Sequence, residues 1–328
     1  MTPQTQEPPA QDPASAPLDV VTGAFSYSGA AIAGELRAAG RRIRTLTGHP
    51  GRAPAGTDVD VRPLDFADPA GLAASLRGAD TLYNTYWVRF AHGGVDHQAA
   101  VANSRILFEA AARAGVRRIV HVSITNPSPD SPYPYFRGKA EVERILAGTG
   151  VPAAIVRPAI LFGTGGVLVN NIAWLLRRVP VFAIGGRGDY RIRPIHVDDL
   201  ARLCVGLGAG GEAVTLDAVG PQSVTFREMV DVIRTAVGSH AVVVNVPGPV
   251  LFSLSRALGV ALRDTLLTRE EYLAMADGLA DSSGPPTGEI ALTDWVAAHG
   301  RELGRAYASE LDRHFRPTSP SAVTRPAG

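Results

Sequence analysis

The feature that most constrains this chain is a regular alternation of strand-like and helix-like segments between Leu18 and about Gly150. Short runs rich in Val, Ile and Leu are each followed by a longer run in which apolar residues have helical spacing. Strands that alternate with helices predict a parallel sheet covered by helices on both faces. The run 119–122 is almost continuously apolar, which suits a strand buried on both faces.

These segments predict a Rossmann-type, doubly wound α/β sheet. We expect strands at 18–25, 42–47, 58–65, 81–87, 118–124 and 153–160. We expect the helices of this half at 29–39, 69–78, 97–114 and 135–147. The loop 48–56 is rich in Gly and Pro and has no helical period, so one crossover is expected to lack its helix.

The second half of the chain predicts a smaller, mostly helical C-terminal substrate lobe. Its helices are expected at 167–178, 199–207, 225–237, 250–262, 269–279 and 292–315, the last broken near Gly300 or Gly304. Asp199 is predicted as the N-cap of helix 200–207. With 328 residues the chain exceeds what one core usually fills. We therefore expect a disordered tail at 1–17, a Rossmann-type domain at 18–163, a second lobe at 164–315 interleaved with the last strands, and a loose tail at 316–328.

Composition excludes several classes of function. With 32 basic and 31 acidic residues, bulk charge gives no argument for nucleic-acid binding. The uncharged runs 158–176 and 235–255 are interrupted by Gly, Asn and Pro, so no membrane span is expected. The single cysteine, Cys204, fits a reducing compartment, and we expect a cytoplasmic protein with a small-molecule substrate. No residue pattern predicts a metal site, and no Gly-x-Ser-x-Gly motif points to a hydrolase.

A glycine-containing turn joins the first strand to the first helix. Gly23 and Gly29 occupy the outer positions of a Gly-x-x-Gly-x-x-Gly spacing, and Ser26 occupies the middle. Such turns bring the backbone and a helix N-terminus close to a pyrophosphate, so we expect Gly23, Phe25, Ser26, Tyr27 and Gly29 to bind a dinucleotide. The alternative is an ordinary strand–helix turn, since many of these carry glycines.

The end of the second strand bears on the choice of nicotinamide cofactor. It is Thr47-Gly48-His49, with Arg52 shortly after and no carboxylate for the ribose hydroxyls of NAD. The lack of a carboxylate favours NADP over NAD, because none repels a 2′-phosphate and Arg52 or His49 can meet it. The alternative is a solvated loop arginine.

A tyrosine and the only lysine of the chain have helical spacing. Of the 32 basic residues only Lys139 is a lysine, and Tyr135 precedes it by four positions, which puts both on one helical face. A nearby ammonium is expected to lower the pKa of the Tyr135 phenol toward that of a general acid–base group. Ser123 ends the preceding strand, where its hydroxyl is expected to hold a substrate oxygen. The alternative for Ser123 is a plain strand-end residue.

Together these motifs resemble the short-chain dehydrogenase/reductase superfamily in its extended or atypical branch. That branch includes NAD-dependent epimerases and dehydratases, NmrA-like proteins and complex I subunit-like proteins. The resemblance rests on an ordered set of short motifs, namely Thr22-Gly23…Gly29, Asp65-Phe66, Asn84-Thr85, Ser123, Tyr135…Lys139, Arg157-Pro158 and 193–199. The fourth strand ends in Asn-Thr-Tyr-Trp where the family has small residues, which predicts a reshaped pocket mouth.

The resemblance implies a role for each motif. Asp65 and Phe66 would contact the adenine, and Asn84 with Thr85 the ribose and phosphates. Tyr135 would be the catalytic acid–base, Lys139 its partner and a ribose ligand, and Ser123 a ligand of the substrate oxygen. Arg157 and Pro158 would lie beside the nicotinamide. A homodimer through helices 97–114 and 135–147 is also implied.

These observations lead to two hypotheses of function. The first is an NAD(P)-dependent oxidoreductase or epimerase-type enzyme, in which Tyr135 moves a proton while a hydride passes between cofactor and substrate. The second is a non-catalytic NAD(P)-binding sensor or assembly subunit. The pairing of Tyr135 with Lys139 favours the first, because a protein that only binds the cofactor has no need of an acid–base pair.

Overall fold

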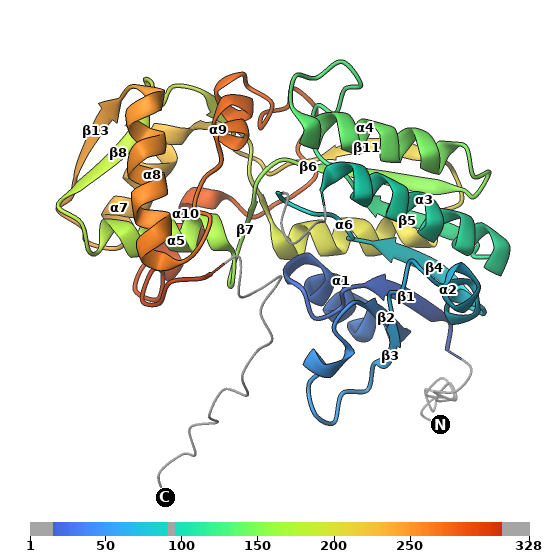
Figure 1. Ribbon diagram of the computed structural model, residues 1–328. Coiled ribbons are helices and arrows are strands. Elements are labelled where there is room, and N and C mark those ends of the chain that lie inside the picture. The colour runs from blue at the N-terminus through green and yellow to red at the C-terminus, as the bar shows by residue number, and fades with distance from the viewer. Residues whose placement is uncertain (1–15, 91–95, 310–328) are drawn as a thin grey trace, which may run out of the picture.

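The fold is built on one seven-stranded parallel sheet, seen in a computed structural model that describes residues 16–90 and 96–309 (Figure 1). The strand order is β11-β6-β5-β4-β1-β2-β3, and every neighbouring pair is parallel. The strands are β1 (Leu18–Thr22), β2 (Arg42–Thr47), β3 (Asp60–Pro63), β4 (Ala79–Asn84), β5 (Arg118–Val122), β6 (Ala153–Pro158) and β11 (Val214–Ala218). The predicted Rossmann-type sheet is confirmed, although several strands end two or three residues earlier than expected.

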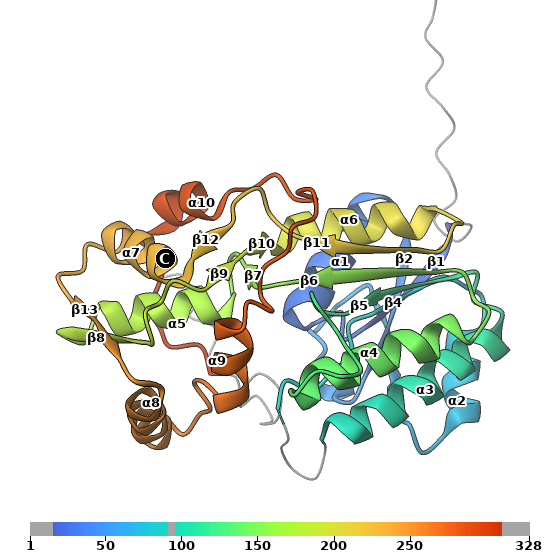
Figure 2. The ribbon, with the colours of Figure 1, turned by 90° about the horizontal axis from the view of Figure 1, so that it is seen from above.

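Helices cover both faces of this sheet (Figure 2). One face carries α2 (Pro69–Leu76), α3 (His97–Ala114) and α4 (Pro134–Ala147), and the other carries α1 (Tyr27–Ala38) and α6 (Val197–Ala209). Successive residues of β5 explain the two layers, since Ile119 packs with the first group and Val120 with the second. The crossover after β2 contains only the short 3-10 turn η2 (Pro50–Arg52), so the expected absence of a full helix there is confirmed.

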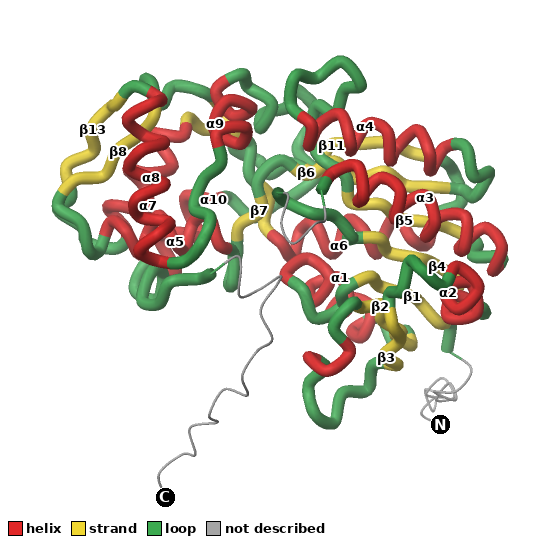
Figure 3. Tube along the Cα trace, viewed as in Figure 1, coloured by secondary structure: helices red, strands yellow, loops and turns green. Residues whose placement is uncertain are grey.

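The second lobe is mostly helical and packs around its own core (Figure 3). Its helices are α5 (Val167–Leu176), α7 (Phe226–Ala236), α8 (Gly248–Leu262), α9 (Arg269–Ala276) and α10 (Leu292–His299). Short strands form three two-stranded sheets, which pair β7 (Leu161–Phe162) with β10 (Ile195–His196), β9 (Arg191–Ile192) with β12 (Val224–Thr225), and β8 (Val181–Gly185) with β13 (Val242–Val246). Because β11 returns to the large sheet after residue 163, the lobe is interleaved with it.

Capping explains two helix starts that the sequence predicts well. Thr225 and Thr268 each form a reciprocal capping box with the glutamate three residues later, so α7 and α9 begin where expected. The last helix was expected at 292–315 with a break near Gly300 or Gly304, and α10 ends at His299, next to Gly300. Residues 310–315 lie outside the described part of the chain. Arg177, at the C-terminal end of α5, donates hydrogen bonds to the carbonyls of Gly300 and Leu303. These bonds hold the segment after α10 against the end of α5.

The predicted N-cap at Asp199 is wrong. Helix α6 begins at Val197, and the His196 side chain accepts the hydrogen bond of the Asp198 amide. The Asp199 carboxylate instead accepts hydrogen bonds from the backbone amides of Glu289 and Ile290 at 3.0 and 2.8 Å. It therefore anchors a distant segment of the chain to helix α6.

Two further findings concern the ends and the surface. The predicted tails lie outside the described residues, apart from residues 16 and 17. Among the described helices, none combines the length and the apolar character that crossing a bilayer requires.

Candidate functional site

The turn after β1 has the geometry of a dinucleotide cradle. Gly23 adopts a positive φ of 67°, which favours glycine. A Cβ atom on Gly29 would lie 2.1 Å from the Gly23 carbonyl oxygen, so only glycine lets α1 approach the turn this closely. Ser26 is the extended N-cap of α1, and its hydroxyl makes no capping hydrogen bond. A tight turn that ends at the N-terminus of a twelve-residue helix fits the pyrophosphate of a dinucleotide.

The ends of β1 and β4 are tied together beside this turn. The Thr85 amide donates to the Thr22 hydroxyl at 2.7 Å, and the Thr85 hydroxyl donates to the Thr22 carbonyl at 2.6 Å. The Asn84 side chain is fully buried, with its amide nitrogen 3.0 Å from Nδ1 of His121. Asn84 thus connects the buried ends of β4 and β5. Thr85 lines the cavity described below.

The residues expected around the adenine and the 2′-phosphate lie on the loops after β2 and β3. Arg52 closes the turn η2 and is half-buried. Asp65 is exposed, and its carboxylate accepts a hydrogen bond from the Ala67 amide at 2.9 Å. Phe66 packs on the Tyr86 ring, with the ring centroids 4.9 Å apart. That Arg52, Asp65 and Phe66 bind the cofactor stays a prediction.

A cavity of about 720 Å³ opens at the carboxyl ends of the central strands. Its lining joins the predicted cofactor residues Tyr27, Thr85 and Pro158 to the predicted catalytic residues Ser123, Tyr135 and Lys139. The remaining lining comes mostly from apolar side chains of the second lobe. The structure therefore brings the sequence-predicted strand ends, helix α4 and the second lobe to one enclosure.

Lys139 is held in place by two contacts. Its ammonium donates to the Val122 carbonyl at 2.9 Å and lies 4.6 Å from the centroid of the Trp87 ring. The side chain is almost completely buried, and this burial lowers the pKa of Lys139 to about 7. Glu143, one turn further along α4, acts in the opposite direction on that pKa.

Tyr135 lies in an aromatic cluster at the start of α4. Its ring meets the Trp87 ring edge to face at 5.7 Å and the His97 ring at 5.6 Å. Burial raises the pKa of the Tyr135 phenol well above its ordinary value, and the Glu271 carboxylate raises it further. The expected lowering of this pKa by Lys139 is therefore wrong, because desolvation outweighs any effect of the ammonium.

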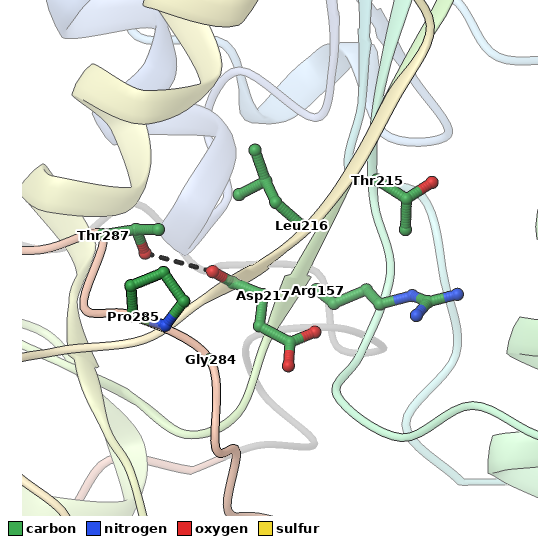
Figure 4. Close-up of a pocket in the computed structure, with 7 residues that line it drawn as sticks. All are labelled: Arg157, Thr215, Leu216, Asp217, Gly284, Pro285 and Thr287. Carbon is green, nitrogen blue, oxygen red and sulfur yellow. Dashed lines mark hydrogen bonds between the residues drawn. The ribbon is translucent and has the colours of Figure 1, made fainter.

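Ser123 belongs to a charged network behind the cavity wall. Its hydroxyl donates to Oε1 of Glu143 at 2.5 Å, and Glu143 also receives two hydrogen bonds from the Arg157 guanidinium. Arg157 lines a second pocket of about 340 Å³, between β11 and the segment 284–287 (Figure 4). There its guanidinium turns away from Asp217, its neighbour across β6 and β11. Arg157 thus reaches the main cavity only through Glu143 and Ser123, while Pro158 lines it directly.

Comparison with known proteins fits this geometry. A family model described as NAD(P)H-binding matches residues 23–169, which span the glycine turn, the strand ends and helix α4. Residues 23–169 form an NAD(P)H-binding domain. This match agrees with the motifs of the glycine turn and the strand ends, which lie within the same residues.

Relatives of this NAD(P)H-binding protein include both enzymes and subunits. It is 23% identical over 63% of its length to the mitochondrial NADH-ubiquinone oxidoreductase 40 kDa subunit of Neurospora crassa, of which the match covers 55%. It is 29% identical over 64% of its length to the (4-alkanoyl-5-oxo-2,5-dihydrofuran-3-yl)methyl phosphate reductase of Streptomyces griseus, of which the match covers 70%. The Neurospora match thus spans only about half of that subunit.

Solved structures share the fold. Citrobacter sp. triphenylmethane reductase complexed with NADP(H) superposes with a TM-score of 0.72 at 20% identity, covering 87% of this chain and 99% of that one. A nucleoside-diphosphate-sugar epimerase from Staphylococcus aureus gives a TM-score of 0.67 at 18% identity, covering 86% and 99%. Both likenesses extend through the second lobe as well as the NAD(P)H-binding domain.

Glu143 and Gly138 are site residues of this domain that the sequence predictions missed, although each has a signal in the sequence. Glu143 continues the spacing of Tyr135 and Lys139 by four more positions, which places it on the same face of α4. Gly138 is a glycine inside a helix, which indicates close approach of another group. That group is the Trp87 ring, since a Cβ atom on Gly138 would lie 2.9 Å from it.

Proposed function

We propose that this protein is an NAD(P)H-dependent reductase that takes a carbonyl substrate in the 720 Å³ cavity. The observation that carries the proposal is the shared lining, because Tyr135 lines the same cavity as Tyr27 and Thr85 beside the glycine turn. A substrate there would lie between the cofactor edge of the sheet and a proton donor.

The chemistry divides between cofactor and protein. When bound, the reduced nicotinamide supplies a hydride to the carbonyl carbon. Tyr135 supplies the proton that the resulting alkoxide oxygen needs, so an alcohol forms and the phenolate recovers its proton from water. A raised pKa keeps the phenol protonated at neutral pH, which suits an acid that works in the direction of reduction.

The reductase from Streptomyces griseus supports this proposal by its name and its 29% identity. A second candidate, a non-catalytic NAD(P)-binding subunit, has support from the Neurospora crassa relative. The contacts of Lys139 also support this candidate, because its ammonium already binds the Val122 carbonyl and the Trp87 ring instead of pairing with Tyr135. Turnover separates the two candidates.

The test uses the purified full chain with NADPH and NADH. Cofactor binding is measured first by fluorescence titration, and oxidation of the cofactor is then followed with a panel of ketones and aldehydes. Tyr135→Phe is expected to keep cofactor affinity and to lose about a hundredfold or more in kcat. Tyr133→Phe is the control, since that phenol donates to Asp277 outside the cavity, and it should keep its turnover.

Two results would count against the reductase. If the wild-type protein binds the cofactor but reduces no member of the panel, the result favours a non-catalytic NAD(P)-binding subunit. If Tyr135→Phe turns over at the wild-type rate, Tyr135 is not the proton donor. Gly29→Ala should abolish cofactor binding in either case, because its Cβ atom would collide with the Gly23 carbonyl.

A further inference from the structure

The cavity continues from Tyr135 far into the second lobe, and its distal part is an apolar arm. We use this name for the part lined by α5, β8 and α8. Its apolar side chains are Val167, Leu168, Ile172, Leu175, Val181, Phe182, Ile184, Leu251, Leu254 and Leu258. An arm of this lining offers dispersion contacts along its length and no complementary charge.

Helix α8 forms one wall of the arm and has little else to pack against. Of its fifteen residues only Gly259 is buried, although the sequence is strongly apolar. Leu251, Leu254 and Leu258 have spacings of three and four, so they present one face of the helix, and all three line the arm. An apolar helix face that lines a cavity is exposed to water there. The free energy falls when an apolar ligand displaces this water.

The charged groups of the cavity lie at the other end or are already paired. Arg89 and Glu271 form an ion pair with 2.5 Å between nitrogen and oxygen, and the Lys139 ammonium lies over the Trp87 ring. At the arm, Asp264 accepts a hydrogen bond from the Tyr307 hydroxyl. A ligand with a diphosphate in the arm would therefore meet a carboxylate and apolar walls.

Two arginines of the second lobe carry the charge that a phosphate needs, but their guanidinium groups donate to other parts of the chain. Arg191 donates to the hydroxyl and the carbonyl of Ser223. Arg193 donates to the carbonyls of Gly220, Ser282 and Gly284. Neither residue lines the cavity, so neither supplies a cation to the arm.

We infer that the substrate is an elongated amphiphile, whose carbonyl lies at Tyr135 and whose aliphatic chain fills the apolar arm. This inference rests on the proposed reductase function and assigns its substrate class. Each methylene that enters the arm leaves water, so affinity should rise about fourfold per methylene until the arm is full. A short polar carbonyl compound would leave the arm hydrated and bind weakly.

The first experiment measures binding apart from turnover. Straight-chain methyl ketones of about six to about twelve carbons are titrated calorimetrically into full-length Tyr135→Phe protein. The dissociation constant should fall about fourfold per added methylene over the series. A dissociation constant that does not change with chain length would overturn the inference. If short ketones are nevertheless reduced by the wild type, the reductase proposal stands while the inference fails.

The second experiment locates the aliphatic chain of the bound ketone. Leu258→Gln places a polar amide in the arm and should weaken binding of the longest ketone about tenfold or more, with little effect on the shortest. Val260→Gln is the matched control, since Val260 lies on the same helix, is 74% exposed and does not line the cavity. Equal losses in the two variants would place the chain outside the arm and overturn the inference. A loss in Leu258→Gln without turnover by the wild type would leave the chain site in place and reject the reductase.

Discussion

The Lys139 ammonium lies over the Trp87 ring, 4.6 Å from its centroid, and donates to the Val122 carbonyl at 2.9 Å. Lys139 comes from helix α4, whereas Trp87 follows strand β4 and Val122 ends strand β5. The only lysine of the chain thus joins a helix to the edge of the sheet at the cofactor side. Stability and binding should both depend on this arrangement.

Gly138→Ala tests the close approach of Trp87 to α4. The new Cβ atom would lie 2.9 Å from the Trp87 ring, so the ring or the helix must shift. We expect the free energy of unfolding to fall by about 1–3 kcal/mol, although alanine is the better helix former. Urea denaturation measures the change. Gly34→Ala in α1 is the control, since nothing lies within 4 Å of its new Cβ atom, and it should stabilise by up to about 1 kcal/mol. Stabilisation by both variants would refute the close contact.

The burial of Lys139 predicts how stability depends on pH. Its pKa is lowered to about 7 in the folded protein, whereas lysine in an unfolded chain titrates at about 10.4. Between these values the unfolded state binds more protons, so the contribution of Lys139 to the free energy of unfolding rises with pH. From about pH 7 to about pH 9 the wild type should gain about 2 kcal/mol relative to Lys139→Met. Urea denaturation at both pH values measures this gain, and parallel pH profiles of the two proteins would contradict it.

Ser123→Ala tests the network behind the cavity. The Ser123 hydroxyl donates to the charged Glu143 carboxylate, and such bonds contribute more than neutral ones. We expect a loss of about 1.5–3 kcal/mol in the free energy of unfolding. Ser104→Ala removes an equally buried hydroxyl that donates to the neutral Ala100 carbonyl, and it should cost about 1 kcal/mol. Equal losses in thermal or urea denaturation would mean that the hydrogen bond from Ser123 to Glu143 stabilises the fold no more than the one from Ser104 to a neutral carbonyl.

Arg52→Ala tests the choice of cofactor. If the Arg52 guanidinium meets the 2′-phosphate, the dissociation constant for NADPH should rise about tenfold or more while that for NADH stays unchanged. Fluorescence titration with both cofactors measures the change. Arg187→Ala removes an exposed arginine of the second lobe, paired with Asp189, and should alter neither constant. Tighter binding of NADH than of NADPH by the wild type would reject the preference for NADP.

Much of the fold followed from local patterns. Alternating apolar runs predicted the parallel sheet, and capping residues such as Thr225 and Thr268 fixed helix starts to within a residue. Gly23, Gly29, Tyr135 and Lys139 were recognisable because their spacing along the chain sets their spacing in a turn or on a helix face. Helix 97–114 was predicted with its exact ends, since Gly115 adopts the left-handed conformation that terminates it.

Contacts between distant segments decided the rest. Asp199 was expected to cap its own helix, but its carboxylate holds the amides of Glu289 and Ile290, ninety positions away. The pKa of Tyr135 depends on burial and on the Glu271 carboxylate, and neither is visible in the spacing to Lys139. The sequence thus determined the elements and the candidate residues, because hydrophobic period and capping are local. Hydrogen-bond partners, desolvation and the apolar arm required the folded chain, because they arise where segments remote in sequence meet.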